Sequence, residues 1–553
     1  MSLSTTTSDK LLIVVFSLLS FFPLLGNVHL FDWDEINFAE CAREMIVSGD
    51  YLHVQIDYLP FHEKPPLFVW MQALSMKLFG INEYAARFPN AVCGLTTLLL
   101  LYYLGKRLHN QRIARWWVLA YAGSILPHFY FKSGIMDPWF NLFILLAYYL
   151  IYIFAYTNKY RYILLSGLSC GLAILVKGPV ALLIIALCLF FLQLVYLFTR
   201  SQKNQFFYLS PGSLFLFCII SLFPISLWYG IDIIKNGPTL FNEFIAYQIR
   251  LFSTEDAGHG GFWGYHVVVL LLGCFPASFL ALHYNQKKYW VNFYPLRFNT
   301  FMGILFFVVL ILFSIVKSKI VHYSSLCYFP ISYFTALYIS RIQQQKSLLS
   351  NMSKYALLAF SLLISLLIVV APMLLKNKIL LQSLLKKDPF AVENLNASTS
   401  WHGFESIVGV LFFITLVYIF IKCHRKPIQW LQYTFITTAG LLQFVFLFYI
   451  QNIEAISQRA SINFYKSLEH QDVYVATYAY KSYAPYFYKK TTHSNNKNSQ
   501  GQYQNPFIDP IDKPLYFSAK IQHKEELFRT KSYEFLYEKN GFVFFRRIAT
   551  DSK

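Results

Sequence analysis

The chain has 553 residues, of which 56% are hydrophobic and only 14% are charged, and its formal net charge is +19. A soluble protein of this size exposes more charge, so the composition predicts a protein that crosses a membrane many times. The positive charge does not indicate nucleic-acid binding, because no nucleic-acid motif accompanies it and the cations lie mainly in short loops between apolar segments.

The apolar segments predict the number of membrane spans. The first one resembles a signal peptide, but it lacks a small-x-small cleavage site, so we interpret it as an uncleaved span. A helix needs about 20 apolar residues to cross the hydrocarbon core. Thirteen segments meet this need, although tight breaks at 177–179 and 317–320 leave eleven or twelve open: 11–30, 89–105, 113–131, 138–157, 162–177, 179–199, 207–230, 264–283, 299–316, 321–339, 355–375, 403–422 and 429–451.

The orientation of the spans follows from lysine and arginine in the short loops. These residues recur in alternate loops, such as 106–115, 159–161 and 422–426, which we therefore place on the cytoplasmic side. The N-terminus is then cytoplasmic. The first long loop, 31–88, therefore falls on the outer side, and an odd number of spans also places the C-terminal tail there.

The cysteines exclude two kinds of site. Most of the eight cysteines lie inside apolar segments, where a free thiol behaves as a small hydrophobe. No pair has CxxC spacing. A disulfide scaffold or a thiolate metal site is therefore not expected.

The chain divides into a transmembrane part, 1–451, and a C-terminal domain, 452–553. The tail contains strand-like runs in "VYVATYAYKSYAPYFYKK" and "KPLYFSAK". In "YEFLYEKNGFVFFRR", two alternating runs are joined by Asn-Gly, which is a strong hairpin signal. We expect a small soluble α/β domain on the outer face.

The first outer loop carries a dense cluster of charge. Its stretches "INFAECAREMIVSG" and "PPLFVWMQALSMKLFG" have apolar residues at helical spacing and glycines at their ends, which predicts two amphipathic helices on the membrane surface. They would hold Asp34 and Glu35, and Glu63 and Lys64, at the lipid–water boundary, where such groups can bind a lipid head group. Charges between spans more often only solvate a loop, and this alternative stays open.

Further charges lie at the outer ends of other spans. Asp137, before Pro138, has an ordinary explanation as a helix cap, which does not exclude catalysis. Lys177, Lys317, Lys319 and His322, together with Lys64, indicate an anionic ligand such as phosphate, and the alternative is snorkelling lysines. The loop "YQIRLFSTEDAGHGGFWGYH" adds Arg250 and His259, and a histidine with a carboxylate from another loop could hold a cation.

The first outer loop resembles that of bacterial aminoarabinose–lipid A transferases and of related polyprenyl-phosphate-dependent glycosyltransferases of the protein O-mannosyltransferase type, in the GT-C superfamily. Asp-Glu, Arg-Glu-Met, Ser-Gly-Asp and Glu-Lys-Pro-Pro occur in the order of that family, and weaker matches such as "GIMDPW" and "VKGPVAL" continue through about 340 residues. The resemblance implies a mainly α GT-C fold with about 13 transmembrane helices, juxtamembrane helices and a small C-terminal α/β periplasmic domain. It also implies a bacterial inner membrane.

The resemblance implies transfer of a sugar, aminoarabinose or a similar one, from a polyprenyl-phosphate carrier to a periplasmic acceptor, with lipid A favoured. A lipid-linked donor comes from the bilayer, so no nucleotide cofactor is expected. The candidate site residues form three groups. The catalytic candidates are Asp34, Glu35 and Asp137; the substrate-binding candidates are Arg43, Lys64, Lys177, Arg250, Lys317, Lys319, His322 and Tyr323; and Glu63 and His259 are candidate ligands of a divalent cation such as zinc.

Two other functions stay open. A protein or other glycan glycosyltransferase could use the same kind of donor. A lipid or sugar transporter would also have many spans, but transporters concentrate charge in mid-membrane, whereas the charge clusters here lie at outer span ends.

Overall fold

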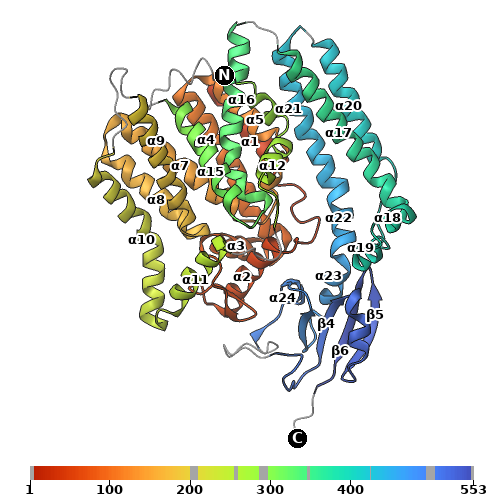
Figure 1. Cartoon of the computed structure of the whole chain (residues 1–553). Coiled ribbons are helices and arrows are strands. Elements are labelled where there is room, and N and C mark those ends of the chain that lie inside the picture. The colour runs from red at the N-terminus through yellow and green to blue at the C-terminus, as the bar shows by residue number, and fades with distance from the viewer. Residues whose placement is uncertain are drawn as a thin grey trace.

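The computed structural model describes residues 5–199, 209–253, 260–284, 297–345, 349–423, 425–493 and 505–549. In Figure 1 the long helices form the upper part of the molecule, and a small sheet domain lies below them. In the described ranges, nine helices are long and apolar enough to cross a membrane: α4 (Glu83–Leu108), α7 (Asp137–Thr157), α8 (Tyr160–Lys177), α9 (Val180–Thr199), α10 (Pro211–Asn236), α15 (Phe298–Ile315), α17 (Asn351–Lys376), α20 (Glu405–Lys422) and the continuous run Pro427–Ser457. That run consists of α21 (Pro427–Phe444), a π-helical turn (Val445–Tyr449) and α22 (Ile450–Ser457).

Four of the thirteen expected spans are shorter or interrupted. The first helix, α1 (Thr5–Ser20), ends just before Pro23, and the expected span 264–283 is broken before Pro276. Proline disfavours a helical conformation in the residue before it, which explains both breaks. The two parts of the span expected at 264–283 are α12 (Tyr265–Gly273) and α13 (Ala277–Ala281). The span expected at 113–131 is divided into α5 (Gln111–Ala122) and α6 (Ile125–Tyr130), and the one expected at 321–339 consists of the 3₁₀ turn η1 (Val321–Cys327) and α16 (Tyr328–Gln345). The count of thirteen stays a prediction.

The first outer loop contains the two expected helices, α2 (Asp34–Ser48) and α3 (Leu67–Phe79), with a two-stranded ribbon between them, β1 (Gln55–Ile56) and β2 (Leu59–Pro60). Gly49 ends α2 with φ 74°, a left-handed conformation that glycine adopts readily.

The expectation of an amphipathic surface helix is wrong for α2. Eleven of its residues, Glu35 to Met45, are buried, charged side chains included. The reason is internal pairing: Arg43 donates to both carboxylate oxygens of Glu40, at 2.7 and 2.6 Å. The charges that suggested a solvated face instead satisfy one another beneath the C-terminal domain, which α2 contacts through α24 (Ala484–Lys489).

The C-terminal domain contains a four-stranded sheet in the order β3 (Tyr474–Tyr478), β4 (Leu515–Lys520), β6 (Phe542–Arg547) and β5 (Tyr533–Lys539). β3 and β4 are parallel and the other pairs are antiparallel. The expected Asn-Gly hairpin is present, and Asn540 and Gly541 both have positive φ, as this kind of turn requires. α23 (Arg459–Lys466) leads into the sheet, so the predicted boundary at 451/452 falls within α22.

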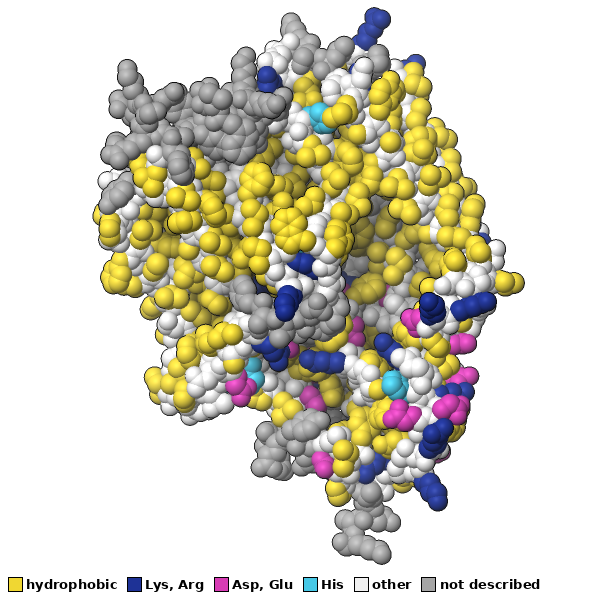
Figure 2. Space-filling view, viewed as in Figure 1, with side chains coloured by type: hydrophobic (Ala, Val, Ile, Leu, Met, Phe, Trp, Pro, Cys, Tyr) yellow, Lys and Arg dark blue, Asp and Glu magenta, His cyan; other side chains and the backbone are white. Residues whose placement is uncertain are grey.

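Figure 2 shows how the side chains are distributed. The described surface over the long helices is mainly hydrophobic, and the acidic and most of the basic side chains in this view gather in the lower part, around the C-terminal domain. The remaining short elements are α11 (Thr239–Ser253), α18 (Lys378–Leu384), α19 (Pro389–Asn394), η4 (Ile521–His523) and α25 (Lys524–Phe528). The first outer loop and α11 lie at the lower end of the helices in Figure 1.

Candidate functional site

A polar cavity of about 340 Å³ lies where the first outer loop meets the ends of several long helices. Five segments far apart in the sequence contribute to it: the start of α2, the turn before α3, the α7–α8 pair, α11 and η1, and a loop of the C-terminal domain adds one side chain. The predicted residues that line it are Asp34, Glu35, Glu63, Lys64, Asp137, Lys177, His322 and Tyr323.

Asp137 and Lys177 form a buried ion pair at this cavity. α7 begins at Asp137 and α8 ends at Lys177, and the two helices pack along their length. The Lys177 Nζ donates to Asp137 Oδ1 at 2.5 Å, and the Asp137 side chain is only 3% exposed. The helix-cap explanation of Asp137 is therefore wrong: the N-cap position is Met136, and the Asp137 carboxylate binds a lysine instead.

His322 lies between the two acidic side chains that the sequence singled out. Its Nε2 is 3.4 Å from Asp34 Oδ2 and 3.8 Å from Asp137 Oδ2. Asp34 is at the start of α2 and more exposed, whereas Asp137 Oδ2 is buried and has no hydrogen-bond partner among the described residues. One carboxylate thus faces the open part of the cavity, and the other carries an acceptor atom that a bound molecule can use.

Lys64 lies near acidic side chains but forms no close ion pair with any of them in the described part of the chain. Its Nζ lies 5.1 Å from the centre of the Tyr247 ring, which is a cation–π contact. Burial lowers the pKa of Lys64, and the nearby Lys177 lowers it further, while Glu63 opposes the shift. An anion bound here would replace the water that this ammonium has lost.

A small apolar cavity of about 60 Å³ adjoins the same two lysines. Lys64, Lys177 and Tyr323 line it together with apolar side chains of α15, among them Leu312 and Phe313. The Lys177 Nζ also lies 5.0 Å from the Tyr323 ring centre. An anionic group held by these lysines can therefore be attached to a hydrocarbon chain.

Glu35 borders the cavity, but both oxygens of its carboxylate already accept hydrogen bonds from the protein. It accepts hydrogen bonds from the Arg87 guanidinium at 2.7 and 3.0 Å and from the backbone amides of Phe31 and Gly134. Burial alone raises the pKa of Glu35, and the charge and hydrogen bonds of Arg87 outweigh it, so that the pKa is lowered. Glu35 holds the loop before α2 in place, and the structure gives it no free oxygen for catalysis.

Two predicted substrate-binding residues lie elsewhere. Arg43 is 1% exposed and, besides Glu40, binds the backbone and side chain of Thr491, so it is not available to a substrate. Lys319 donates to the backbone carbonyls of Phe313, Ser314 and Val316 at the end of α15, where lysine commonly caps a helix. Neither residue lines the cavity.

The remaining predicted residues are Lys317, Arg250, His259 and Glu63, and only Glu63 lines the polar cavity among those that the structure describes. Lys317 is exposed and does not line the cavity. Arg250, also exposed, lies 5.1 Å from the Tyr247 ring centre. His259 lies outside the described residues. Glu63 accepts a hydrogen bond from Tyr247 at 3.2 Å and faces Lys481 at 3.8 Å.

The side chains of the cavity that sequence reasoning missed include Trp33, Tyr247 and Lys481. Trp33 and Tyr247 are aromatic residues in an aromatic-rich chain, and no local pattern distinguishes them. Lys481 belongs to the C-terminal domain, and only the packing of that domain against the first outer loop brings it to the cavity.

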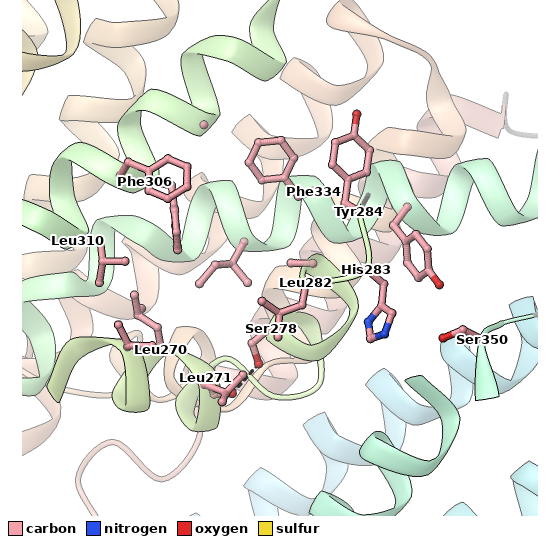
Figure 3. Close-up of a pocket in the computed structure, with 16 residues that line it drawn as sticks. Leu270, Leu271, Ser278, Leu282, His283, Tyr284, Phe306, Leu310, Phe334 and Ser350 are labelled. Atoms are coloured by element: carbon pink, nitrogen blue, oxygen red, sulfur yellow. Dashed lines mark hydrogen bonds between the residues drawn. The ribbon is translucent and has the colours of Figure 1, made fainter. Parts of the chain in front are cut away.

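A larger cavity, of about 830 Å³, lies among α12, α13, α15 and α16. Figure 3 shows that its walls are mainly leucine and aromatic side chains, such as Leu270, Phe306 and Phe334, and that Ser278 turns back to bond a backbone carbonyl. None of the described residues that line it is acidic. It suits a hydrocarbon chain, and the acidic and basic groups needed for chemistry are in the smaller cavity.

The fold and the polar cavity define an integral membrane protein of the GT-C glycosyltransferase fold, with several spans. The crystal structure of ArnT from Cupriavidus metallidurans bound to undecaprenyl phosphate superimposes on 99% of this chain and 99% of its own, with a TM-score of 0.75 and 17% identity. The apo structure of the same protein matches equally well.

The sequence comparisons agree with the fold. The family model described as dolichyl-phosphate-mannose-protein mannosyltransferase matches residues 63–228, a range that contains Lys64, Asp137 and Lys177. The undecaprenyl phosphate-alpha-4-amino-4-deoxy-L-arabinose arabinosyl transferase of Edwardsiella ictaluri is 28% identical over 376 residues, 65% of each protein. That of Photorhabdus laumondii is 30% identical over 325 residues, 57% of this chain and 56% of the relative.

The matched region therefore spans just under two thirds of the first of these curated relatives and a little over half of the second. The chain is similar to polyprenyl-phosphate-dependent glycosyltransferases of the group that contains the aminoarabinose transferases and the protein O-mannosyltransferases, and it shares the GT-C fold. The resemblance to this family, expected from the first outer loop, is confirmed.

Proposed function

We propose that this protein is a membrane glycosyltransferase that moves a sugar from a polyprenyl-phosphate carrier to an acceptor at the outer face of the membrane. The observation that supports it is the polar cavity, where Asp34 and Asp137 lie beside Lys64 and Lys177, and those two lysines also border an apolar cavity. A phosphate with a hydrocarbon tail and an attached sugar needs this combination of groups.

In the proposed binding mode, the donor phosphate lies between Lys64 and Lys177 and its prenyl chain leaves through the apolar side cavity. Tyr323, which lines both cavities, marks the junction. The sugar then extends toward Asp34 and His322. The unpartnered Oδ2 of Asp137 is placed to accept a hydrogen bond from the sugar or its amino group.

The reaction breaks the bond between the anomeric carbon and the phosphate oxygen and forms a bond from that carbon to an acceptor oxygen. Attack from the face opposite the phosphate inverts the configuration. The leaving phosphate gains negative charge in the transition state, and the two lysine ammonium groups stabilise it. A hydroxyl acceptor loses its proton to Asp34 as general base, whereas an ionised phosphate acceptor needs no base, and Asp34 then orients the donor.

The comparisons favour aminoarabinose, or a similar sugar, as the group transferred. The relatives from Edwardsiella and Photorhabdus are named for transfer of 4-amino-4-deoxy-L-arabinose with undecaprenyl phosphate. We take lipid A as the favoured acceptor. The second candidate is a protein or another glycan as acceptor, which the mannosyltransferase family model favours.

The proposed location is the bacterial inner membrane, with a cytoplasmic N-terminus and the C-terminal domain in the periplasm. The cavity lies at the end of the helices nearest the C-terminal domain, so this orientation gives the site access to periplasmic acceptors. The sugar-phosphate group of a lipid-linked donor in the outer half of the bilayer lies at the same depth in the membrane as the cavity.

A divalent cation, zinc for example, held by Glu63 and His259 also remains a proposal. The Glu63 carboxylate is near the cavity and is available in part, since its described partners are Tyr247 and Lys481. The described residues contain no group of three or more candidate metal ligands, so substrate would have to complete the coordination. Metal analysis of the purified protein with and without undecaprenyl phosphate tests this, and protein that contains no metal in either state and is insensitive to chelators would end the proposal.

Mass spectrometry of lipid A from cells with and without this protein tests the main proposal. We expect a mass increase of one sugar only in cells that contain the protein, and none with the Asp137→Asn variant at equal expression. Unmodified lipid A in the presence of folded protein and of sugar-loaded donor would exclude lipid A as the acceptor. Assay of the same membranes with the loaded donor and protein or glycan acceptors would then decide whether the protein is a transferase at all.

A further inference from the structure

The C-terminal domain contributes a cation, Lys481, to the polar cavity. The residue is in the loop between β3 and α24. The residue on each side is anchored within the domain: the Tyr480 hydroxyl lies 2.6 Å from the Ser518 Oγ, and Ser482 Oγ accepts a hydrogen bond from the Ala484 amide. The loop therefore presents Lys481 from a fixed backbone.

At the cavity, Lys481 contacts groups of the first outer loop. Its Nζ is 3.8 Å from Glu63 Oε1 and 5.7 Å from the centre of the Trp33 ring. The Lys481 side chain is still 50% exposed. A lysine ammonium has three donors, and one long ion pair leaves it able to bind a further anion.

The position of Lys481 differs from that of the other cavity lysines. Lys64 and Lys177 border the apolar side cavity, and Lys481 is not among the residues that line it. The donor has a hydrocarbon tail attached to its phosphate, so the donor phosphate belongs with Lys64 and Lys177. The Lys481 ammonium, from the C-terminal domain, is then available to bind the acceptor, which is the second substrate.

We propose that Lys481 is a specificity-determining residue that binds an anionic group, a phosphate, of the acceptor where the acceptor enters between the C-terminal domain and the first outer loop. This inference rests on the proposed transferase function. It gives the C-terminal domain a direct part in acceptor recognition, with Trp33 and Glu63 holding the ammonium in place until the acceptor arrives.

The test uses the full-length protein in detergent, with Lys481→Ala and Lys481→Gln as variants. Lys490→Ala is a matched control, because Lys490 is in the same domain, is 49% exposed and pairs with one carboxylate, Glu469, outside the cavity. The acceptor probes are lipid A with two phosphates and monophosphoryl lipid A. The donor site is measured separately by titration with undecaprenyl phosphate.

We expect both Lys481 variants to raise the KM for the two-phosphate lipid A by about ten- to a hundred-fold, the usual effect of losing one charge-assisted contact, and to reduce the preference for it over the monophosphoryl form. Their Kd for undecaprenyl phosphate should equal that of the wild type, which also shows that the variants are folded. The control should behave as the wild type does.

Two results would overturn the inference while the wild type is active. The first is an unchanged KM for lipid A in both Lys481 variants. The second is a loss of affinity for undecaprenyl phosphate in these variants that is as large as the rise in their KM for lipid A. A wild-type protein that binds undecaprenyl phosphate but transfers sugar to neither lipid would instead contradict the proposed function, and the inference with it.

Discussion

Asp137 and Lys177 are 40 residues apart, and a 2.5 Å hydrogen bond joins them because one begins α7 and the other ends α8. An antiparallel helix pair necessarily brings the start of its first helix next to the end of its second. In this pair the two ends carry opposite charges and open into the polar cavity. The helical hairpin thus sets the distance between a carboxylate and a cation at the proposed site of reaction.

Replacing Asp137 by asparagine should abolish transfer while leaving a folded protein in the membrane. The amide cannot bind Lys177 as a carboxylate does, so the lysine changes its position near the donor phosphate. Turnover of sugar-loaded donor, measured together with size-exclusion behaviour in detergent, checks this. Asp472→Asn, which changes a surface pair with Lys513, is the control, and normal turnover in Asp137→Asn would remove this carboxylate from the mechanism.

Asp34→Asn should also stop transfer, because Asp34 is the more exposed of the two acidic residues beside His322 and is therefore accessible to an incoming acceptor. Titration with undecaprenyl phosphate separates its two proposed roles. If Asp34 is a general base, the variant keeps the donor affinity of the wild type although transfer stops. If it orients the donor, the variant has a weaker donor affinity, and an active variant with unchanged donor affinity would exclude both roles.

Lys64→Ala should weaken binding of polyprenyl phosphate by about ten- to a hundred-fold, the loss expected for one charge-assisted contact. Turnover should fall as well, because the phosphate gains charge as it leaves. Arginine should restore binding only in part, since its planar group does not match a site shaped for a point charge. Titration of the Lys64→Ala variant with undecaprenyl phosphate tests this prediction. An unchanged affinity would mean that Lys64 only anchors the loop at the membrane surface.

Donor binding should be sensitive to alkaline pH because the pKa of Lys64 is lowered by burial and by Lys177. A lysine is charged below its pKa, so a lowered pKa moves the loss of the cation to a pH below that of an ordinary lysine, about 10.4. Affinity for undecaprenyl phosphate should therefore fall as pH rises, and at a lower pH than an ordinary lysine would cause. The residual affinity of Lys64→Arg should not fall there, and an identical alkaline limb in both proteins would assign it to another group.

Much of the local structure was predictable from the sequence, whereas partners remote in the chain were not. Gly49 and the Asn540–Gly541 pair end a helix and form a turn through their own backbone preferences, so local sequence is enough to predict both. Most of the acidic and basic residues of the cavity were predicted as a set, because span orientation and the family resemblance place them on one side, but Lys481 of the C-terminal domain was not. Their distances depend on how the helices pack.

Three predicted site residues share one feature: the sequence suggests that the charged side chain faces a ligand, whereas the fold supplies it with a protein partner. Glu35 binds Arg87, 52 residues away, and Arg43 binds Thr491, 448 residues away. Lys319 caps the helix that precedes it. Sequence spacing cannot distinguish such residues from ligand-binding ones, since the partner is chosen by tertiary packing.

The Glu35–Arg87 pair should matter for stability rather than for chemistry. Glu35→Ala leaves a buried guanidinium without its carboxylate, which typically destabilises a protein by about 3–5 kcal/mol. We expect a large drop in the thermal stability of the variant in detergent. Glu534→Ala, which breaks the exposed pair with Arg546, should change stability by at most about 1 kcal/mol, and equal effects of the two substitutions would contradict the structural role of Glu35.

Gln458 should influence the rate of transfer although it does not line the cavity. It lies at the break between α22 and α23, where its side-chain amide donates to the Leu30 carbonyl at 2.7 Å and its oxygen accepts from the Asp32 amide at 3.2 Å. Gln458 therefore helps to hold the segment that leads to Asp34 from the C-terminal side, where the Tyr488 hydroxyl also accepts a hydrogen bond from the Leu30 amide at 2.7 Å. Without the Gln458 side chain, Asp34 samples positions away from His322, and small displacements of a reacting group lower the rate strongly.

Gln458→Ala should accordingly lower kcat and leave the affinity for undecaprenyl phosphate unchanged, because Lys64 and Lys177 are held by other elements. Gln458→Glu keeps the acceptor oxygen but loses the donor to Leu30, so an intermediate kcat is expected. Gln471→Ala is the control, since the Gln471 side chain bonds the backbone of Ser467 at an exposed site of the same domain. If Gln458→Ala weakens donor binding in proportion to kcat, the residue supports the whole fold, and the specific positioning of Asp34 by Gln458 is refuted.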